Sequence, residues 1–341
     1  MASPSARNDV AAARALLARY FAPTPLTRAA SLCGPGRDVY LKIETGLPTG
    51  SFKVRGAIYS LSVNAARRAV REVVAASTGN HGAAVAYAGR LLGITATIFL
   101  PTNPNPVKAA RIRELGARIV ESGAPDLSAA IDAAYEYCDR TDAFFLHDAV
   151  DPDIPTGTAT IAAEILEQLP TVDTIYVPMG DTALVRGVAS AAKTLELVRI
   201  IGVVAERAPA YAMSWRSGEA IGTASADTIA DGLAVRRALA PNVDAIRACV
   251  DDVRTVSDED MLAAMAWLTA REKVTAEPAG SAATAAYLTE IGLDAAKVGL
   301  KTNARSQRTR ASVLLVTGGN VAPEITASVD ALRRRGPAPP P

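Results

Sequence analysis

Lys53 stands in a local sequence that suits chemistry better than solvation. It follows Gly50, Ser51 and Phe52 in the stretch KIETGLPTGSFKVRGA, residues 42–57, where a turn-rich loop runs into an expected helix. Lysine side chains are usually solvated charges at the surface, whereas this loop is suited to placing one side chain. A lysine amine forms Schiff bases with carbonyl compounds when it is neutral, and burial favours the neutral form. Lys53 is therefore a candidate for covalent chemistry.

Three turns rich in glycine, hydroxyl and amide residues add candidate anion-binding sites. The turns at 77–82 (STGNHG) and 179–187 (MGDTALVRG) each follow an expected strand and open a helix, and the turn at 316–321 (VTGGNV) ends the last strand. In parallel α/β sheets, ligands bind at the carboxyl ends of strands, where helix N-termini direct free N–H groups outward. None of the turns has the glycine spacing of the standard nucleotide-binding loops. With Lys53, they indicate a cofactor that carries both a carbonyl and a phosphate group.

The composition excludes several other classes of protein. The 341-residue chain has a formal net charge of +1, without the basic stripe that favours nucleic acid. Its apolar runs are too short to span a membrane, and its first residues lack the order of a secretory signal. Cys33, Cys138 and Cys249 form no CxxC pair, and the only histidines are His81 and His147, so we expect neither a disulfide framework nor a metal site. We expect a cytoplasmic protein with a small-molecule partner, and no nucleic-acid or membrane partner.

Strand-like and helical patterns alternate along the chain from about residue 70. Expected strands cover residues 71–77, 94–101, 117–123, 174–180, 199–206 and 312–319, and expected helices cover residues 1–21, 83–93, 105–116, 127–140, 158–169, 183–195, 258–272 and 280–291. We expect Gly93 to end one helix and Ser257 to be the N-cap of another. The βαβα order predicts an α/β fold with parallel sheets and helical crossovers. The basic segment 297–310 is expected to be a solvated loop rather than a nucleic-acid contact.

Five motifs carry a resemblance to a known family. They occur in this order along the chain: TGSFKVRGA (49–57), STGNHG (77–82), TIADGLAV (228–235), EPAG (277–280) and TGGN (317–320). Together they resemble the serine/threonine dehydratase (ammonia-lyase) and serine racemase group of fold-type II pyridoxal-phosphate enzymes, over nearly the whole chain. The likeness is to the short catabolic or racemase-like members.

The resemblance implies a two-domain α/β fold of the tryptophan synthase β type, in which each domain is a mostly parallel twisted sheet flanked by helices. A large cofactor-binding domain would comprise residues 1–70 and 150–330, and a small mobile domain would comprise residues 71–149. Residues 331–341 are expected to be a disordered tail on composition. The family also implies a homodimer.

The resemblance assigns the cofactor, pyridoxal 5'-phosphate, to named residues. Lys53 would bind it through a Schiff base, Phe52 would flank its ring, Asn80 would hydrogen-bond its 3-hydroxyl group, and Thr317 would face its pyridine nitrogen. The phosphate would be held by the turn that consists of Gly180, Asp181, Thr182, Ala183 and Leu184. Glu277 would border the ring, although a carboxylate at this position could instead cap the helix that follows.

The resemblance also implies the reaction. The substrate carboxylate would be bound by Ser77, Thr78, Gly79 and His81. Lys53 would remove the Cα proton as general base, and loss of the β-hydroxyl group would lead to a 2-oxo acid and ammonia. The expected enzyme is a lyase of amino-acid metabolism that dehydrates threonine, serine or a 3-hydroxy relative. An amino-acid racemase, a β- or γ-replacement synthase on the same fold, and a non-catalytic binding protein remain alternatives.

Three positions depart from the family pattern. Thr78 stands where racemases carry the serine that works on the face opposite the lysine, so its hydroxyl group is a second catalytic candidate. Asp181 replaces a glycine of the phosphate turn and brings a negative charge beside a dianion, which is tolerable if Asp181 points away, for instance by capping the helix. Glu206 matches one ligand of the racemase-like cation site, but Ala212 replaces a second, so we expect no metal.

Overall fold

The computed structural model describes residues 4–104, 106–124, 127–193, 198–297 and 310–335. The strands are β1 (Leu26–Arg28), β2 (Arg37–Ile43), β3 (Glu72–Ala76), β4 (Thr95–Leu100), β5 (Arg118–Glu121), β6 (Phe144–Phe145), β7 (Val172–Pro178), β8 (Arg199–Ala205), β9 (Asp252–Val256) and β10 (Arg310–Val316). The α-helices are α1 (Pro4–Leu17), α2 (Lys53–Arg67), α3 (Asn80–Leu92), α4 (Pro106–Glu114), α5 (Leu127–Thr141), α6 (Ile154–Gln168), α7 (Ala183–Ala192), α8 (Ala210–Ser217), α9 (Ala240–Cys249), α10 (Asp258–Trp267), α11 (Pro278–Lys297) and α12 (Pro323–Arg335).

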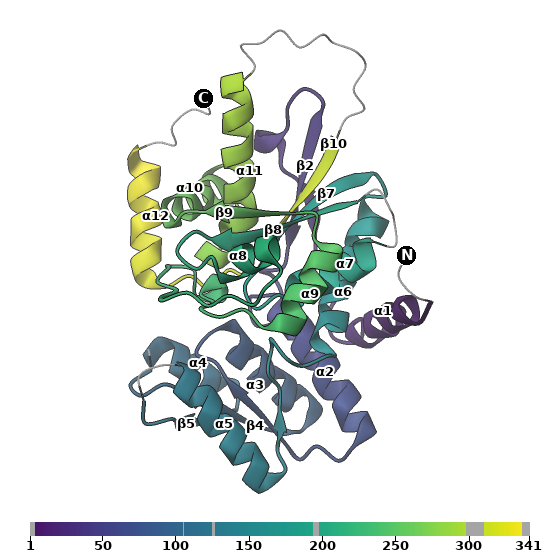
Figure 1. The fold of residues 1–341 in the computed structure, drawn as a ribbon, viewed down its shortest axis with the longest axis vertical. Helices are drawn as coiled ribbons and strands as arrows, with labels where there is room; N and C mark the ends of the chain where they lie inside the picture. Colours follow the sequence, from purple (N-terminus) through teal and green to yellow (C-terminus); the bar gives the residue numbers. More distant parts are fainter. Residues whose placement is uncertain (1–3, 105, 125–126, 194–197, 298–309, 336–341) are drawn as a thin grey trace.

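Within these ranges the strands form two sheets, each flanked by helices (Figure 1). The larger sheet has the order β1-β2-β10-β7-β8-β9, and the smaller sheet has the order β5-β4-β3-β6. Neighbouring strands are parallel throughout, except that β1 is antiparallel to β2. The predicted α/β fold of two mostly parallel sheets is therefore confirmed.

The smaller sheet is buried on both faces, as a parallel sheet with helical crossovers must be. Val73 and Ala75 of β3 pack into a core with residues of α2 and α3, whereas Val74 packs on the other side with Ala130 and Ala134 of α5. Helix α2 precedes this sheet in the chain and packs against both α3 and α6. The start of α2 therefore lies where the two sheets and their helices meet.

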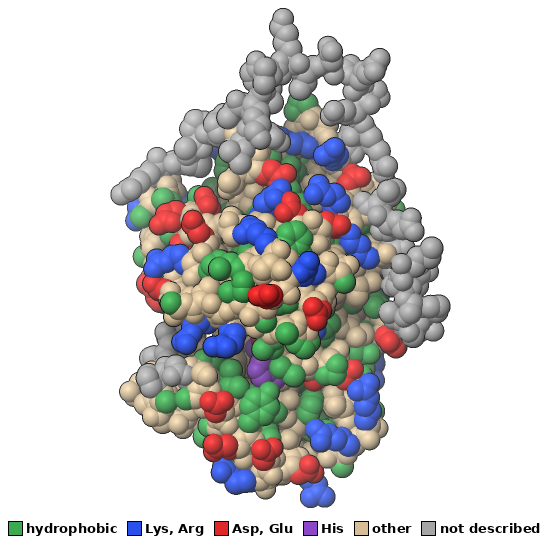
Figure 2. Space-filling view, viewed as in Figure 1, with side chains coloured by type: hydrophobic (Ala, Val, Ile, Leu, Met, Phe, Trp, Pro, Cys, Tyr) green, Lys and Arg blue, Asp and Glu red, His purple; other side chains and the backbone are tan. Residues whose placement is uncertain are grey.

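The larger sheet holds the two main hydrophobic cores. One core joins its strands to α6, α7 and α9, and the other joins them to α10 and α11. The two sheets occupy separate halves of the molecule, and a histidine side chain is visible in the hollow between the halves (Figure 2).

Local predictions are largely confirmed, with three kinds of difference. Gly93 ends α3 with a φ of 68°, and Ser257 caps α10 in a complete capping box with Asp260. Strands β1, β2, β6 and β9 and helices α8, α9 and α12 were not predicted. Because α12 runs to Arg335, the expectation of a disordered tail is wrong for residues 331–335. Residues 336–341 and most of the expected solvated loop at 297–310 lie outside the described residues.

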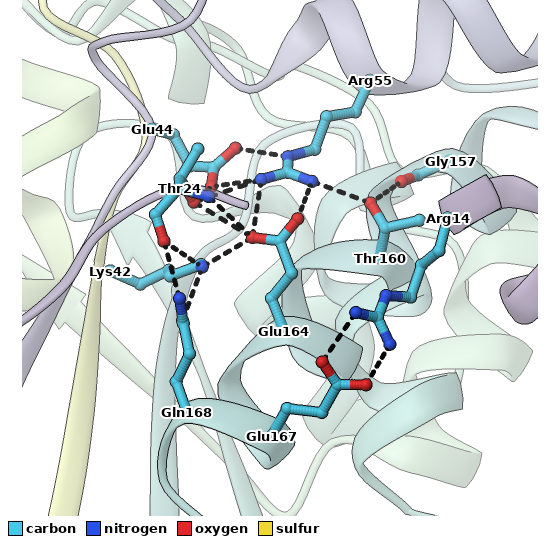
Figure 3. Close-up of polar contacts among 10 residues, drawn as sticks. All are labelled: Arg14, Thr24, Lys42, Glu44, Arg55, Gly157, Thr160, Glu164, Glu167 and Gln168. Atoms are coloured by element: carbon cyan, nitrogen blue, oxygen red, sulfur yellow. Dashed lines mark hydrogen bonds and ion pairs between the residues drawn. The ribbon is translucent and has the colours of Figure 1, made fainter. Parts of the chain in front are cut away.

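A buried network of charged side chains ties α2 to β2 and α6 (Figure 3). Arg55 donates to Glu44 Oε2 at 2.7 Å and to Glu164 Oε1 at 2.6 Å, and Lys42 Nζ donates to Glu164 Oε2 at 2.6 Å. The four side chains are at most 6% exposed, and they carry two positive and two negative charges. Arg55 comes two residues after Lys53, so this network fixes the start of the helix that carries the candidate lysine.

Candidate active site

A cavity of about 590 Å³ lies at the carboxyl ends of strands from both sheets. Its wall includes the residues that follow β3, β6, β7 and β10 and the first residues of α2 and α3. With the exception of Ala183, every site residue named from the sequence lines it: Phe52, Lys53, Ser77, Thr78, Gly79, Asn80, His81, Gly180, Asp181, Thr182, Leu184, Glu277 and Thr317. Motifs that are far apart in the chain thus converge on one cavity, as ligand sites in parallel α/β folds do.

Lys53 is the first residue of α2, and its side chain is 14% exposed. Its Nζ atom lies 2.8 Å from Asp148 Oδ2 and 2.7 Å from Asp181 Oδ2, and 5.4 Å from the centre of the Phe52 ring. Burial by itself lowers the pKa of Lys53, but the two carboxylates outweigh burial and raise this pKa above its ordinary value. The expectation of a neutral amine is therefore wrong for this arrangement, because the sequence did not reveal Asp148.

Asp181 accepts a hydrogen bond at the start of α7, but it does not point away from the cavity. Its Oδ1 atom accepts a hydrogen bond from the backbone N–H of Ala183 at 3.0 Å, while its Oδ2 atom holds Lys53. Burial and the charge of Asp148 raise the pKa of Asp181. Burial acts in the same direction on Asp148, but Lys53 outweighs it and keeps the pKa of Asp148 well below its usual range.

The turn between β7 and α7 has features that suit an anion. Thr182 has a φ of 76°, its side chain is buried, and its hydroxyl group has no hydrogen-bond partner among the described residues. The free N–H groups at the start of α7 lie at the same place. A Cβ atom at Gly180 would lie 2.2 Å from the carbonyl oxygen of Gly232, so only glycine fits there.

Asn80 and Glu277, 197 residues apart in the chain, meet at the cavity wall. Asn80 Nδ2 donates to Glu277 Oε1 at 2.6 Å, and Asn80 Oδ1 accepts from Asn320 Nδ2 at 2.6 Å. Arg111 in turn donates to Asn320. The placement of Glu277 beside the cavity was expected, and Asn320 belongs to the quoted TGGN motif although no role was given to it. Arg111 carried no sequence signal.

The turn that follows β3 brings its polar groups to the same cavity. Gly79 N donates to Ser77 Oγ at 3.2 Å. His81 Nε2 lies 2.8 Å from the carbonyl oxygen of Leu146, so this nitrogen carries the proton and its Nδ1 atom faces Asp148 at 4.0 Å. Thr78, in the same turn, also lines the cavity. One ring nitrogen of His81 therefore binds the chain segment that carries Asp148.

The segment after β6 supplies site residues that the sequence analysis missed. His147 and Asp148 both line the cavity, and burial lowers the pKa of His147. An acid that comes directly after a buried strand is a signal in principle, but β6 has only two residues and does not stand out as a strand. Asp148 is therefore identified as a site residue by its contact with Lys53 in the folded chain, and not by its local sequence.

The donor set of the cavity fits a phosphorylated carbonyl cofactor. A lysine amine, an aromatic ring beside it, and a helix N-terminus with a buried, unpartnered threonine hydroxyl group are present together. Asp181 adds an unfavourable charge next to the phosphate position, but its contact with Ala183 leaves the other N–H groups of the turn in place. Within the part of the chain that the structure describes, no group of three or more His, Cys, Asp or Glu side chains could hold a metal ion, and none of the helices is long and apolar enough to cross a membrane.

Two mostly parallel sheets, with a lysine at the start of a helix facing strand ends and an anion-binding turn, are the features of a fold-type II pyridoxal-phosphate enzyme. The family model for "Pyridoxal-phosphate dependent enzyme" matches residues 17–299. The chain therefore belongs to this family, and the predicted cofactor is confirmed.

The similar proteins carry the names of two activities, threonine ammonia-lyase (or dehydratase) and serine racemase. The L-threonine ammonia-lyase of Thermotoga maritima is 34% identical over 84% of this chain and 68% of the relative, so the chain spans about two thirds of its length. The catabolic L-threonine dehydratase of Escherichia coli K12 is 33% identical over 86% of this chain and 87% of the relative. The structure of maize serine racemase aligns with a TM-score of 0.84 and 30% identity, covering 96% of this chain and 98% of that one.

Proposed function

We propose that this protein is a pyridoxal-phosphate-dependent ammonia-lyase that dehydrates a β-hydroxy amino acid to a 2-oxo acid and ammonia. The observation that carries the proposal is the position of Lys53 in the shared cavity, at the carboxyl ends of strands from both sheets. The likeness to two threonine ammonia-lyases supports this reaction class. Threonine, serine and 3-hydroxy relatives are the candidate substrates.

The cofactor-binding roles follow the contacts of the cavity. Lys53 would attach the cofactor, Phe52 would pack beside its ring, and Thr317, directly after β10, would face the ring nitrogen. Asn80, held by Glu277 at 2.6 Å, would contact the 3-hydroxyl group. The turn formed by Gly180, Asp181, Thr182, Ala183 and Leu184 would hold the phosphate. When it is bound, pyridoxal phosphate supplies an electron sink for the charge that develops at the substrate Cα atom.

The remaining residues handle the substrate. Ser77, Gly79 and His81 bind the substrate carboxylate at the N-terminus of α3, where free N–H groups and the helix dipole favour an anion. Lys53 Nζ removes the Cα proton, and it can do so only after it has given up its own proton and left Asp148 and Asp181. A threonine hydroxyl group does not stabilise a protonated ring, so Thr317 favours prompt elimination over transamination.

Racemisation is the second candidate, and the observation that favours it is Thr78. Its hydroxyl group lines the cavity on the turn assigned to the substrate carboxylate, where serine acts in the racemase-like members. The additional methyl group crowds this position, so elimination remains the main proposal. Replacement chemistry would require a second-substrate pocket.

One experiment separates these activities. Purified protein is examined for the visible absorbance of lysine-bound cofactor and is then offered hydroxy amino acids while 2-oxo acid, ammonia and substrate chirality are measured. We expect visible absorbance and equal amounts of 2-oxo acid and ammonia. Inversion without ammonia would replace the lyase with a racemase, and turnover that requires an added thiol or amine would replace it with a synthase.

The variant Lys53→Ala tests the role of Lys53 directly. We expect this variant to lose both the visible absorbance of the attached cofactor and all turnover, while it keeps the far-ultraviolet circular dichroism of the parent protein. Full activity in Lys53→Ala would refute the role of Lys53 and the proposed reaction with it.

The setting of the enzyme is proposed from the family resemblance. We propose that the enzyme is a cytoplasmic homodimer. In each subunit, residues 71–149 would form a small mobile domain, and residues 1–70 and 150–330 would form the large cofactor-binding domain. Light scattering on the purified protein tests the dimer. Solution scattering with and without substrate tests the mobility, since closure of the small domain would reduce the radius of gyration.

A further inference from the structure

The cavity carries more acidic than basic side chains. The charged residues that line it are the acids Asp148, Asp181, Asp231 and Glu277 and the bases Lys53 and Arg111. Arg111 donates to Asn320 and to the carbonyl oxygen of Thr49 at 2.8 Å. Among the described residues, Lys53 is the cation whose nitrogen lies within 2.8 Å of both Asp148 and Asp181.

Other cationic groups near these acids do not replace Lys53. Arg186 feels the charge of Asp181, but its guanidinium group donates to the carbonyl oxygen of Ala149 at 3.4 Å and is not part of the cavity wall. His147 lies next to Asp148, with Nδ1 at 3.7 Å from Oδ1, yet burial lowers its pKa and favours the neutral ring. His81 also acts on Asp148, and its charge helps to lower the pKa of that acid. Its Nδ1 atom lies 4.0 Å from Asp148 Oδ2, compared with 2.8 Å for Lys53 Nζ, and its Nε2 atom donates to the carbonyl oxygen of Leu146.

Catalysis, on the function proposed above, removes the positive charge of Lys53 from this contact. The lysine nitrogen must either be bonded to the cofactor or be uncharged when it acts as a base. Asp148 and Asp181 are 25% and 20% exposed, and two such partly buried carboxylates without a cation are unfavourable, because desolvation is no longer offset by an opposite charge. A cation that arrives with the substrate would restore the balance at the moment it is needed.

The position of the two carboxylates matches the side chain of a bound amino acid. A general base lies within hydrogen-bond reach of the proton that it removes, so Lys53 Nζ lies next to the substrate Cα atom. The carboxylate oxygens, 2.7 and 2.8 Å from Nζ, are then near the substrate's β and γ positions. The Phe52 ring, 5.4 Å from Nζ, lies beside the same place, and an aromatic ring attracts cations.

We propose that Asp148 and Asp181 form a specificity subsite for a positively charged nitrogen group on the substrate side chain. The preferred substrate is then a β-hydroxy α-amino acid that carries an ammonium, amidinium or guanidinium group close to its β-carbon. The two carboxylates hold this group in the place where they hold the Lys53 ammonium group in the structure. Threonine, which lacks such a group, is a poorer substrate.

Three substrates of similar shape test this preference. Threonine, 4-hydroxythreonine and 4-aminothreonine carry a hydrogen, a hydroxyl group and an ammonium group on the same carbon. We expect kcat/KM for 4-aminothreonine to exceed the other two values by at least about tenfold, the ratio that one charge-assisted hydrogen bond supports. Equal values for all three substrates would overturn the subsite while leaving the lyase function intact. In that case a proton taken up by Asp181 would replace the substrate cation.

Variants show whether the two acids cause the preference. Asp148→Asn and Asp181→Asn keep the shape and remove the charge, and each is expected to lower the ratio of kcat/KM for 4-aminothreonine to that for threonine by about tenfold. Asp231→Asn, at another acid on the cavity wall, is the matched control and should change this ratio by less than about twofold. An unchanged ratio in both test variants would refute their role.

Binding of unreactive ligands gives a measurement that does not depend on turnover. 2,4-Diaminobutyrate and norvaline are nearly the same size, and both lack the β-hydroxyl group, but only the first has a side-chain ammonium group. Isothermal titration of the cofactor-loaded protein should show at least about tenfold tighter binding of diaminobutyrate. Equal affinities would overturn the subsite. If none of the hydroxy amino acids reacts, the lyase function fails, and this comparison still decides the subsite.

Discussion

Replacement of Arg55 by methionine tests the buried network that holds helix α2. The guanidinium group of Arg55 makes six hydrogen bonds, to Glu44, Glu164, Thr160 and Thr24. Methionine is similar in length but uncharged, so the variant leaves Glu44 and Glu164 buried with only Lys42 as a cation. The network then carries one positive and two negative charges on side chains that are at most 6% exposed.

The expected cost follows from this burial. Removal of one partner from a buried ion pair destabilises a protein by about 3–5 kcal/mol, because the remaining charge is left without compensation. Arg67 offers a control on the same helix: its side chain is 61% exposed and pairs with Asp153 at 2.8 Å, and exposed pairs contribute about 0–1 kcal/mol. Arg55→Met should therefore lower the free energy of unfolding by at least about 3 kcal/mol, and Arg67→Met by less than about 1 kcal/mol.

Urea denaturation followed by circular dichroism measures both variants against the parent protein. Arg55→Lys adds an intermediate case, since lysine keeps the charge but loses the planar fork that binds two carboxylates at once. We expect the order of stability to be parent, Arg67→Met, Arg55→Lys, Arg55→Met. If Arg55→Met is no less stable than Arg67→Met, the network does not stabilise the fold, and the reasoning from burial is refuted.

Two further predictions concern the cavity. Gly180→Ala would place a methyl group 2.2 Å from the carbonyl oxygen of Gly232, so the turn must shift. We expect fluorescence titration to show at least about tenfold weaker cofactor binding, and we expect the free energy of unfolding to fall by about 1–3 kcal/mol. Unchanged affinity would show that the turn does not hold the phosphate. Burial lowers the pKa of His147 in the folded protein, so the unfolded chain takes up a proton first as the pH falls below about 6.5. The stability contributed by the neutral ring is then present above pH 6.5 and lost below it. His147→Gln should make the fall in urea midpoint between about pH 7 and 5 less steep. An unaltered fall would refute the assignment of this loss of stability to His147.

The sequence predicted those parts of the site that depend on neighbouring residues. Lys53, the turn at 77–82 and the turn at 179–187 each sit at a junction between a loop or strand and a helix, and such junctions are readable from short patterns. The N-cap role of Ser257 is of the same kind. The motif order then allowed one family to account for all of them.

Contacts between distant residues were not readable in this way. Strand β2 was missed because its sequence, RDVYLKI, contains a lysine whose buried ammonium group is held by partners outside the strand, among them Glu164, 122 residues away. The Asp148 contact with Lys53 crosses 95 residues and follows a strand of two residues. The sequence left open whether Asp181 points away from the turn, and the structure has it in the cavity wall, where its carboxylate contacts Lys53. In each case a charge is placed by a partner that the local sequence does not show.

Helix α2 connects the two charged clusters of the molecule through its first three residues. Successive residues of an α-helix are rotated by about 100°, so Lys53 and Arg55 project from nearly opposite sides. One side meets the cavity acids, and the other meets the buried network that anchors the helix. Close approach of α6 makes this arrangement possible: a Cβ atom at Gly157 would lie 2.7 Å from the carbonyl oxygen of Arg55. The glycine lets α6 bring Glu164 within reach of Arg55, and the anchored helix in turn fixes where Lys53 Nζ can act.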